Sequence, residues 1–306
     1  MGTLIARLTG AVRADASESV GARLLRALDA LGGAEELDTV AVPLKQVVQA
    51  LPLGRLRGVL HGRPLGHPLH PALVQVPVGA WLSVAVLDLV PGCRRAAHVL
   101  VGVGVVTAVP AAVTGWVDWA EQHEQQMRTG LAHAASVAAA VGLYGASWAA
   151  RARGCSGLGR VLGFAGLVAV GSGATIGGHL AYRQAAGANK TEPVPHLVGP
   201  GWHTLGRAAE FAVGAPERRM IGEVPVLVVR EAAGMFHVLA DRCSHFSGPL
   251  SEGKVAEGCV TCPWHGSVFR LSDGWNVGGP ATAPQPVFIT RTDGGGNLQA
   301  RLPDAG

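Results

Sequence analysis

The pattern of hydrophobic and polar positions divides the chain into a long apolar region and a later region of short mixed runs. Four stretches, residues 71–87, 96–117, 131–150 and 161–182, contain no Asp, Glu, Lys or Arg. A helix rises about 1.5 Å per residue and the hydrocarbon core of a bilayer is about 30 Å thick, so roughly 20 residues span it. Helices of a soluble bundle usually keep a polar face, and these stretches have none. The pattern therefore predicts an all-α bundle of four transmembrane helices.

The region before these stretches is polar and amphipathic. Leu44, Val47, Val48 and Leu51 have helical spacing and predict one short amphipathic helix. This helix is expected either on the membrane surface or as a soluble cap. An even number of spans would place both ends of the chain on one side of the membrane.

The pattern changes after residue 182. A polar stretch with Gly and Pro leads to short β-branched runs at residues 224–230, 236–239 and 287–291, which predict a small antiparallel β domain. The expected protein is multidomain. Its parts are a polar and amphipathic segment (1–60), an all-α transmembrane domain (61–185), a linker (186–195) and an all-β domain (196–306).

Composition agrees with a membrane-embedded part. Only 15% of the residues are charged, against roughly a quarter in an ordinary soluble domain. Membrane lipid is therefore an expected partner. The net charge of +4 includes no dense Lys/Arg run, so no nucleic-acid partner is expected. The odd number of cysteines, five, argues against a scaffold held by disulfides.

The candidate chemistry lies in two short motifs of the β region. Cys243-Ser-His245 and Cys262-Pro-Trp-His265 are separated by the sixteen residues 246–261. Two Cys and two His in paired loops can hold structural zinc or an iron–sulfur cluster. In a Rieske centre one iron takes two thiolates and the other two imidazoles, so each loop must deliver one of each. Zinc fingers instead usually pair Cys with Cys and His with His.

The neighbouring residues decide between these possibilities. Cys243-Ser-His-Phe-Ser-Gly-Pro-Leu250 and Cys262-Pro-Trp-His-Gly-Ser267 resemble the two cluster loops of Rieske iron–sulfur proteins, and Gly279-Pro-Ala281 resembles the proline-bearing third loop of that family. The resemblance implies an all-β fold of small antiparallel sheets with a cluster-binding subdomain. It also implies that a [2Fe–2S] cluster is the cofactor and that its iron ligands are Cys243, His245, Cys262 and His265.

The subtype follows from residues that this chain lacks. Respiratory-complex members of the family carry a disulfide between the loops, where this chain has Trp264 and Gly248 or its neighbours. They also usually have a Tyr that is hydrogen-bonded to a ligand sulfur, where this chain has Phe269. Fewer hydrogen bonds to the sulfurs lower the reduction potential. The chain therefore resembles the ferredoxin-type branch, and Cys259 is interpreted as a strand residue.

These features predict a carrier of single electrons that exchanges them with an electron donor or acceptor protein. The 41 residues after His265 are too few for the catalytic domain of a ring-hydroxylating oxygenase, so a redox component is expected rather than a stand-alone catalyst. No catalytic residue is assigned. Two alternatives are a cluster-based redox or nitric-oxide sensor and the ferredoxin component of a membrane oxygenase system.

Histidines at the ends of the spans form a second candidate site. Histidine is uncommon inside membrane spans and often functional there. The candidates are His67, His70, His133 and His179. They could bind haem b or a transition metal, or could serve only as polar anchors at the membrane interface. Residues 60–185 resemble an uncharacterised family of bacterial four-helix membrane domains, a resemblance that implies no activity.

Orientation in the membrane is the last expectation. Lys and Arg are divided almost equally between the two sides, so their count does not set the orientation. Export of a folded cluster domain needs a twin-arginine signal, but the joint before the last span reads Arg151-Ala-Arg153. The expected location is the cell membrane, multi-pass, with the β domain in the cytoplasm.

Overall fold

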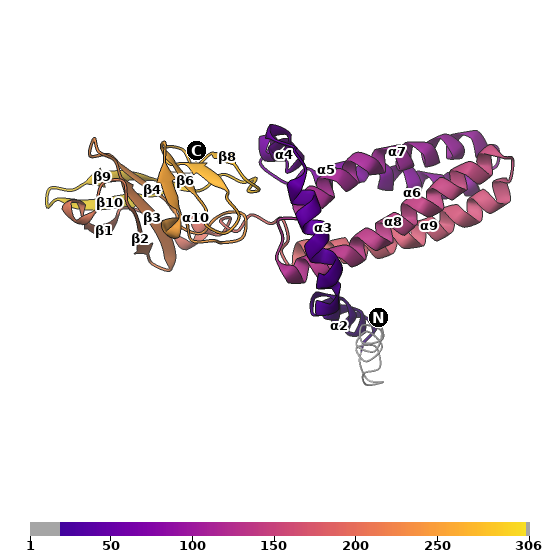
Figure 1. Ribbon diagram of the computed structural model, residues 1–306, viewed down its shortest axis with the longest axis horizontal. Helices are drawn as coiled ribbons and strands as arrows, with labels where there is room; N and C mark the ends of the chain where they lie inside the picture. Colours follow the sequence, from indigo (N-terminus) through magenta and orange to yellow (C-terminus); the bar gives the residue numbers. More distant parts are fainter. Residues whose placement is uncertain (1–18, 304–306) are drawn as a thin grey trace. The chain divides into compact units, whose positions relative to one another are not determined.

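The computed structural model describes residues 19–303 and consists of two compact units (Figure 1). The helical unit includes the chain up to Gly54 and the stretch Leu69–Ala186. The β unit includes Arg55–Pro68 and the chain from Gly187 onward. A helical N-terminal region followed by a C-terminal β domain is thus confirmed. The expected boundaries at residues 60, 185 and 195 remain predictions, and residues 1–18 of the expected N-terminal segment lie outside the described residues.

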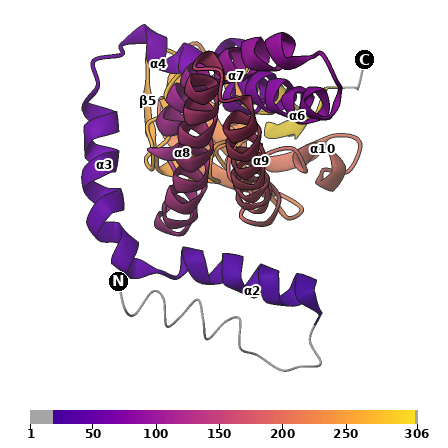
Figure 2. The same cartoon turned by 90° about the vertical axis from the view of Figure 1, so that its right-hand side faces the viewer.

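The helical unit contains short helices followed by long ones. They are α2 (Val20–Gly32), the 3₁₀ turn η1 (Glu35–Leu37), α3 (Asp38–Ala50), α5 (His70–Leu73), α6 (Gln75–Leu89), α7 (Arg94–Trp119), α8 (Glu124–Ala152) and α9 (Ser156–Gly178). A π-helical turn, His179–Arg183, continues α9. Figure 2 looks onto the end of this unit and shows α6, α7, α8 and α9 side by side.

Three helical segments among the described residues are long and apolar enough to cross a membrane. They are His70–Leu89, Arg94–Trp119 and Ser156–Arg183. Helix α8 is longer than each of them, but Ala and Gly dominate it and it also carries polar residues such as His133 and Ser147. Its lower hydropathy leaves the expected number of four spans as a prediction.

The long helices turn large apolar side chains outward. Val86, Val106 and Val168 are 62%, 70% and 71% exposed. The buried residues of α9, in contrast, are all glycines. A soluble protein would bury such valines, whereas lipid accommodates them, and small residues allow membrane helices to approach closely. This distribution of side chains is typical of a membrane bundle.

Helix α3 packs against the turn that joins α7 and α8. Its Ala41 and Val48 form a cluster with Trp119, Ala120 and Met127. The amphipathic spacing in the sequence therefore predicted a real helix. Val48, with Leu44 beside it, contacts protein within the helical unit, whereas Val47 is 61% exposed.

The β unit is built on two antiparallel sheets. Strands β1 (His203–Arg207), β2 (Pro216–Ile221), β3 (Val224–Arg230), β4 (Phe236–Ala240), β9 (Val287–Thr292) and β10 (Asn297–Arg301) form a six-stranded sheet in the order β1-β10-β9-β4-β3-β2. Strands β5 (Lys254–Ala256), β6 (Cys259–Thr261), β7 (Val268–Arg270) and β8 (Asn276–Gly278) form a four-stranded sheet in chain order. The smaller sheet is thus an insertion between β4 and β9. The three β-type runs of the sequence correspond to β3, β4 and β9.

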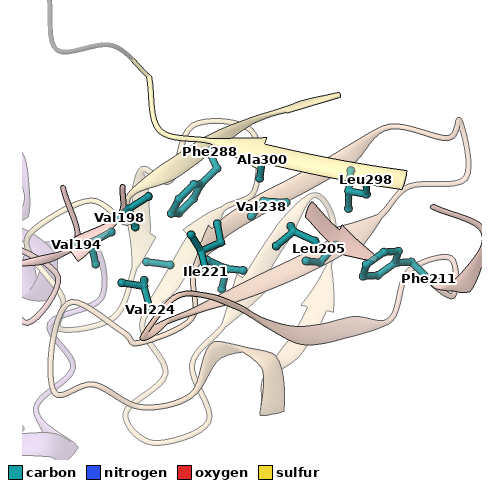
Figure 3. Packing of buried hydrophobic residues seen from close by; sticks show 13 residues of the cluster. Val194, Val198, Leu205, Phe211, Ile221, Val224, Val238, Phe288, Leu298 and Ala300 are labelled. Carbon is teal, nitrogen blue, oxygen red and sulfur yellow. The ribbon is translucent and has the colours of Figure 1, made fainter. Parts of the chain in front are cut away.

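Strand β3 connects the two hydrophobic cores of this unit. Because successive side chains of a strand point to opposite faces, Val226 and Val228 enter one core, while Leu227 and Val229 enter the other. Figure 3 shows the first core, in which Val194 and Val198 around the short helix α10 (Val194–Leu197) pack with the large sheet. The second core also contains Cys243 and Cys262. The candidate site is therefore anchored in a packed interior.

The segment Arg55–Pro68 contains the helix α4 (Arg55–Leu60) and the 3₁₀ turn η2 (Arg63–Leu65). Arg63 donates from Nη1 to the carbonyl oxygen of Val277 on β8 at 3.0 Å. A Cβ at Gly58 would lie 2.7 Å from the Arg63 guanidinium carbon, so glycine leaves the space that this guanidinium occupies. Nothing in the hydrophobic pattern indicated that this segment belongs to the β unit.

Candidate metal centre

The four candidate ligands lie in two loops, one after a strand of the large sheet and one within the small sheet. The first loop (residues 243–248) follows β4, and the second loop (residues 262–267) joins β6 to β7. Cys243 and Cys262 are buried, whereas His245 and His265 are half-buried. Each loop therefore contributes one buried thiol and one imidazole nearer the surface.

The two loops repeat one backbone conformation. In each, the amide of the cysteine donates to the carbonyl oxygen five residues later at 2.8 Å. The residue four positions after the cysteine, Ser247 or Gly266, donates back to the cysteine carbonyl at 2.8 or 3.1 Å. Both residues have positive φ, +61° and +69°. These paired hydrogen bonds hold each cysteine and its histidine on a fixed turn.

The two thiols lie in hydrogen-bond contact with each other. This hydrogen bond, together with burial, raises the pKa of Cys243, whereas the same hydrogen bond lowers the pKa of Cys262 to about 6. Backbone amides two and three residues after each cysteine also donate to its sulfur. The hydrogen bond places a thiol proton between the two sulfurs. A metal that binds both sulfurs displaces this proton, and the four amides favour the resulting charge.

The two imidazoles form a second pair. The ring centroids of His245 and His265 are 5.1 Å apart and the rings are nearly perpendicular, at 88°. The Nδ1 atom of His245 is buried. The ring of Phe246 packs edge-on against His245 at 4.4 Å. The two imidazoles are thus close together, and both remain partly exposed to solvent.

The space between the loops accepts only a glycine. A Cβ at Gly248 would lie 2.8 Å from the sulfur of Cys262 and 3.0 Å from Cγ of Trp264. This contact places the backbone of the first loop against the thiol of the second. Gly248 and Trp264 thus face each other between the two loops. Two paired thiols beside two paired imidazoles fit a two-iron cluster with unlike iron atoms.

A third loop supports the second from behind. The buried hydroxyl of Ser267 accepts a hydrogen bond from the amide of Ala281 at 3.1 Å. A Cβ at Gly279, where φ is +78°, would lie 2.5 Å from the carbonyl oxygen of Gly266. Phe269 is fully buried in the core beneath.

Replacing Gly279 with alanine is therefore expected to displace the second loop and to lower the iron content of purified protein severely. A matched control is Gly296→Ala, because Gly296 has the same positive φ, +79°, but nothing lies within 4 Å of its added Cβ. Both changes carry the cost of a left-handed alanine, about 1–2 kcal/mol. Iron analysis per chain should separate them. Equal iron content in the two variants would contradict the role assigned to this close approach.

The first loop is fixed by a residue that no sequence pattern indicated. Gln285 is buried, accepts from the amide of Ser244 at 3.1 Å and donates to the carbonyl oxygens of Ala240 and Arg242 at 2.8 and 2.5 Å. The hydroxyl of Ser244 donates to the carbonyl oxygen of Ala283 at 2.8 Å. A single glutamine in a run rich in proline gave no signal that could have identified it.

The four candidate histidines of the apolar region do not form one cluster. His70 and His133 approach each other, with ring centroids 6.3 Å apart. His179 instead lies with Nε2 3.4 Å from Oδ1 of Asp29, and the guanidinium of Arg183 lowers the pKa of that carboxyl. His67 belongs to the β unit and its Nδ1 lies 3.0 Å from the carbonyl oxygen of Pro68. In the described helical unit no three His, Cys, Asp or Glu side chains are placed to hold one metal ion.

Comparison with known proteins agrees with this geometry. Residues 201–289 match the Rieske [2Fe–2S] domain family, and residues 66–190 match a family of predicted membrane proteins, DUF2231. The chain is 38% identical over 90 residues to the anthranilate 1,2-dioxygenase ferredoxin subunit of Burkholderia cepacia. The aligned residues make up 29% of this chain and 82% of the relative. The 3-phenylpropionate/cinnamic acid dioxygenase ferredoxin subunit of Escherichia coli K12 is 33% identical over 90 residues. These residues make up 29% of this chain and 84% of that relative.

The solved structure of a carbazole 1,9a-dioxygenase ferredoxin from Nocardioides aromaticivorans is 21% identical, with a TM-score of 0.32. The match covers 34% of this chain and 100% of the ferredoxin chain. None of these matches concerns haem or another metal in the helical unit.

The β unit with its two loops is that of an iron–sulfur protein whose cofactor is a [2Fe–2S] cluster. This chain belongs to the Rieske [2Fe–2S] family, and in the same chain it carries a membrane-type domain of the DUF2231 family. Its Rieske domain is homologous to ferredoxin components of oxygenase systems, which supports electron transfer.

Proposed function

We propose that this protein is a membrane-anchored carrier of single electrons. Cys243 and Cys262 would hold one iron of the cluster through their sulfurs, and His245 and His265 would hold the other through their imidazoles. The observation that supports this assignment is the meeting of a thiol pair and an imidazole pair across two matching loops. The bound cluster supplies reversible uptake and release of one electron.

The surrounding residues perform the supporting tasks. The two amides directed at each sulfur stabilise its negative charge, and the packed core behind the cysteines excludes water from the sulfurs. The half-buried histidines lie nearest the surface, next to Trp264, which is 52% exposed. An electron donor or acceptor protein would dock over this edge, because it gives the shortest path to the cluster.

The docking partner is a protein that exchanges single electrons. Rieske ferredoxins pair with oxygenase or reductase proteins, and the relatives named above are ferredoxin subunits of dioxygenases. We infer that this chain exchanges electrons with a membrane-associated oxidoreductase of this kind. The helical domain would keep the carrier next to its partner at the lipid surface, crossing the membrane four times with the Rieske domain in the cytoplasm. A haem b or a transition metal held by the helical domain is a further proposed redox partner.

A potentiometric titration of the full-length protein in detergent tests the carrier role. The cluster should be reduced and reoxidised reversibly over repeated cycles, with the same EPR amplitude in each reduced state. A cluster that is lost on the first oxidation would contradict the carrier and would support a redox or nitric-oxide sensor instead.

Lys190 provides a more specific test of this site. Its amide donates to the carbonyl oxygen of Ser244 at 3.0 Å, and its ammonium lies 5.6 Å from the ring centroid of Phe246. Burial lowers the pKa of Lys190. A cation this close to the first loop favours the reduced cluster, which carries one more negative charge.

Lys190→Met is therefore expected to lower the midpoint potential. Unit charges about 10 Å apart interact by roughly 1–2 kcal/mol at an effective dielectric constant near 20, which corresponds to about 40–90 mV for one electron. Lys254→Met is the matched control, because Lys254 is exposed on β5 and a charge there is screened by solvent. Equal midpoint potentials in the two variants would show that Lys190 does not influence the potential of the cluster.

A further inference from the structure

The long helices form two hairpins that share one pattern of side chains. The first hairpin runs from His70 through α6 and α7 to Gly115, and the second runs from His133 through α8 and α9 to Gly177. In each, prominent side chains lie at the histidine itself, 11 residues later and 18 residues later. Each of these residues contacts its own counterpart in the other hairpin. The three pairs are His70 with His133, Trp81 with Tyr144, and Asp88 with Arg151.

These pairs follow the whole length of the bundle. The rings of Trp81 and Tyr144 are stacked, with centroids 4.3 Å apart and planes 2° from parallel. The carboxylate of Asp88 accepts two hydrogen bonds from Arg151, at 2.8 and 2.5 Å. At about 1.5 Å of rise per residue, the aromatic pair lies about 16 Å along the helix from the histidines and the ion pair about 27 Å.

The second helix of each hairpin repeats the pattern as well. A Cβ at Gly104 would lie 2.2 Å from the indole nitrogen of Trp81, and a Cβ at Gly166 would lie 2.8 Å from the ring of Tyr144. These two glycines are equivalent positions of α7 and α9. Each makes room for the large aromatic side chain of its own hairpin.

Contact between equivalent positions is characteristic of a two-fold axis, on which each residue meets its own copy. Parallel internal repeats related by an axis along the membrane normal are known in membrane proteins. The three pairs therefore define a pseudo-two-fold axis between α6 and α8. A ligand on this axis meets the same kind of side chain from both sides.

At the histidine end of the axis, both imidazoles are oriented in the same way. Nδ1 of His70 lies 2.8 Å from the carbonyl oxygen of Ala111, and Nδ1 of His133 lies 2.9 Å from that of Gly173. A carbonyl oxygen only accepts, so Nδ1 carries the hydrogen and Nε2 carries a lone pair. Metal-binding histidines almost always donate their other N–H in this manner.

Glycines also hold the two rings in place. A Cβ at Gly115 would lie 2.9 Å from Nδ1 of His70, and a Cβ at Gly177 would lie 3.2 Å from Cε1 of His133. Each glycine follows its carbonyl acceptor by four residues, one helical turn. The imidazole, its acceptor and its glycine thus occur as a repeated set.

We propose that His70 and His133 bind one metal centre on the pseudo-two-fold axis, each through Nε2. A metal–nitrogen distance of about 2 Å places imidazoles on opposite sides of one metal with ring centroids about 6 Å apart. The observed separation is 6.3 Å. The inference deepens the proposed function and rests on it for the role of the site, which is to exchange single electrons with the Rieske cluster.

The number of protein ligands selects the kind of metal. Zinc sites use at least three protein ligands, and the described helical unit has no such group. Haem iron takes its equatorial nitrogens from the macrocycle and needs only two axial ligands from protein. Cu(I) is also stable with two nitrogen ligands. Both change their charge by one electron, so the site is assigned to a bis-imidazole haem iron or copper centre.

The test uses full-length protein in detergent, titrated separately with haemin and, without oxygen, with Cu(I). We expect one equivalent of one of them to bind, haemin with the low-spin spectrum of two imidazole ligands or Cu(I) with a stoichiometry of one per chain. His70→Ala and His133→Ala should each convert the haem spectrum to high-spin or abolish copper binding. His98→Ala and His179→Ala are matched controls that should bind as the unchanged protein does.

The EPR signal of the Rieske cluster serves as the internal control in every variant. Its presence shows that the β unit is folded, and its behaviour tests the proposed carrier function separately from this site. Thermal unfolding of each variant in detergent checks the helical unit. Absence of binding by both haemin and Cu(I), or binding that persists in the double variant His70→Ala/His133→Ala, would overturn the inference while leaving the carrier intact.

Discussion

Replacing Cys262 with serine is expected to abolish the [2Fe–2S] cluster. The serine hydroxyl is a poor substitute for a thiolate, and the iron would lose one of its two cysteine ligands in a loop whose backbone is fixed. Iron analysis and EPR of the reduced protein should show loss of both irons and of the signal.

Cys259→Ser is the matched control for this variant. Cys259 lies three residues earlier on β6, is half-buried and forms no disulfide. The control should keep its iron and its EPR signal. If both cysteine variants kept the cluster, Cys262 would not be a ligand. Loss of the cluster in both would show instead that the strand, and not one sulfur, determines binding.

The ion pair between Asp88 and Arg151 is expected to dominate the stability of the helical unit. Its side chains are 3% and 4% exposed, and Arg160 approaches the same carboxylate at 3.8 Å. Removing one partner of a buried pair leaves an uncompensated charge and costs about 3–5 kcal/mol. Asp88→Asn should therefore lower the free energy of unfolding in detergent by this amount.

The exchanged variant Asp88→Arg/Arg151→Asp separates the stability that comes from charge pairing from the stability that depends on where each charge lies. The exchange should restore only part of the lost stability, because the new arginine would lie beside Arg160 and the new aspartate would face the carbonyl oxygen of Gly159. Ser83→Ala is a suitable control, since the Ser83 hydroxyl bonds only the carbonyl of its own helix at Gly79 and is exposed. A loss below about 1 kcal/mol in Asp88→Asn would contradict the importance of the pair.

The parts of the structure that the sequence predicted are those with strong local patterns. The apolar stretches became α6 to α9, and the β-branched runs became β3, β4 and β9 because their side chains alternate between two cores. The two loop motifs could be identified because cysteine and histidine occur in them at short spacing. Their close approach in the structure follows from the pairing of β6 with β7 beside β4.

The parts that could not be predicted depend on contacts between distant residues. Gln285 fixes the first loop from 41 residues away, and Arg63 reaches Val277 across 214 residues. The repeat in the helical unit is hidden for another reason. Two of its three axial pairs consist of unlike residues, Asp88 with Arg151 and Trp81 with Tyr144, because charge and size must be complementary where the copies meet. A comparison of the two hairpins by sequence identity would miss both.

The proposed cluster has two irons, held between a thiolate pair and an imidazole pair in the last hundred residues. EPR of the dithionite-reduced full-length protein, with iron, zinc and sulfide analysis of the same sample, tests it most directly. The account predicts two irons and two acid-labile sulfides per chain, with a Rieske-type signal that disappears on oxidation. A sample that contained zinc and gave no such signal after anaerobic purification would contradict it.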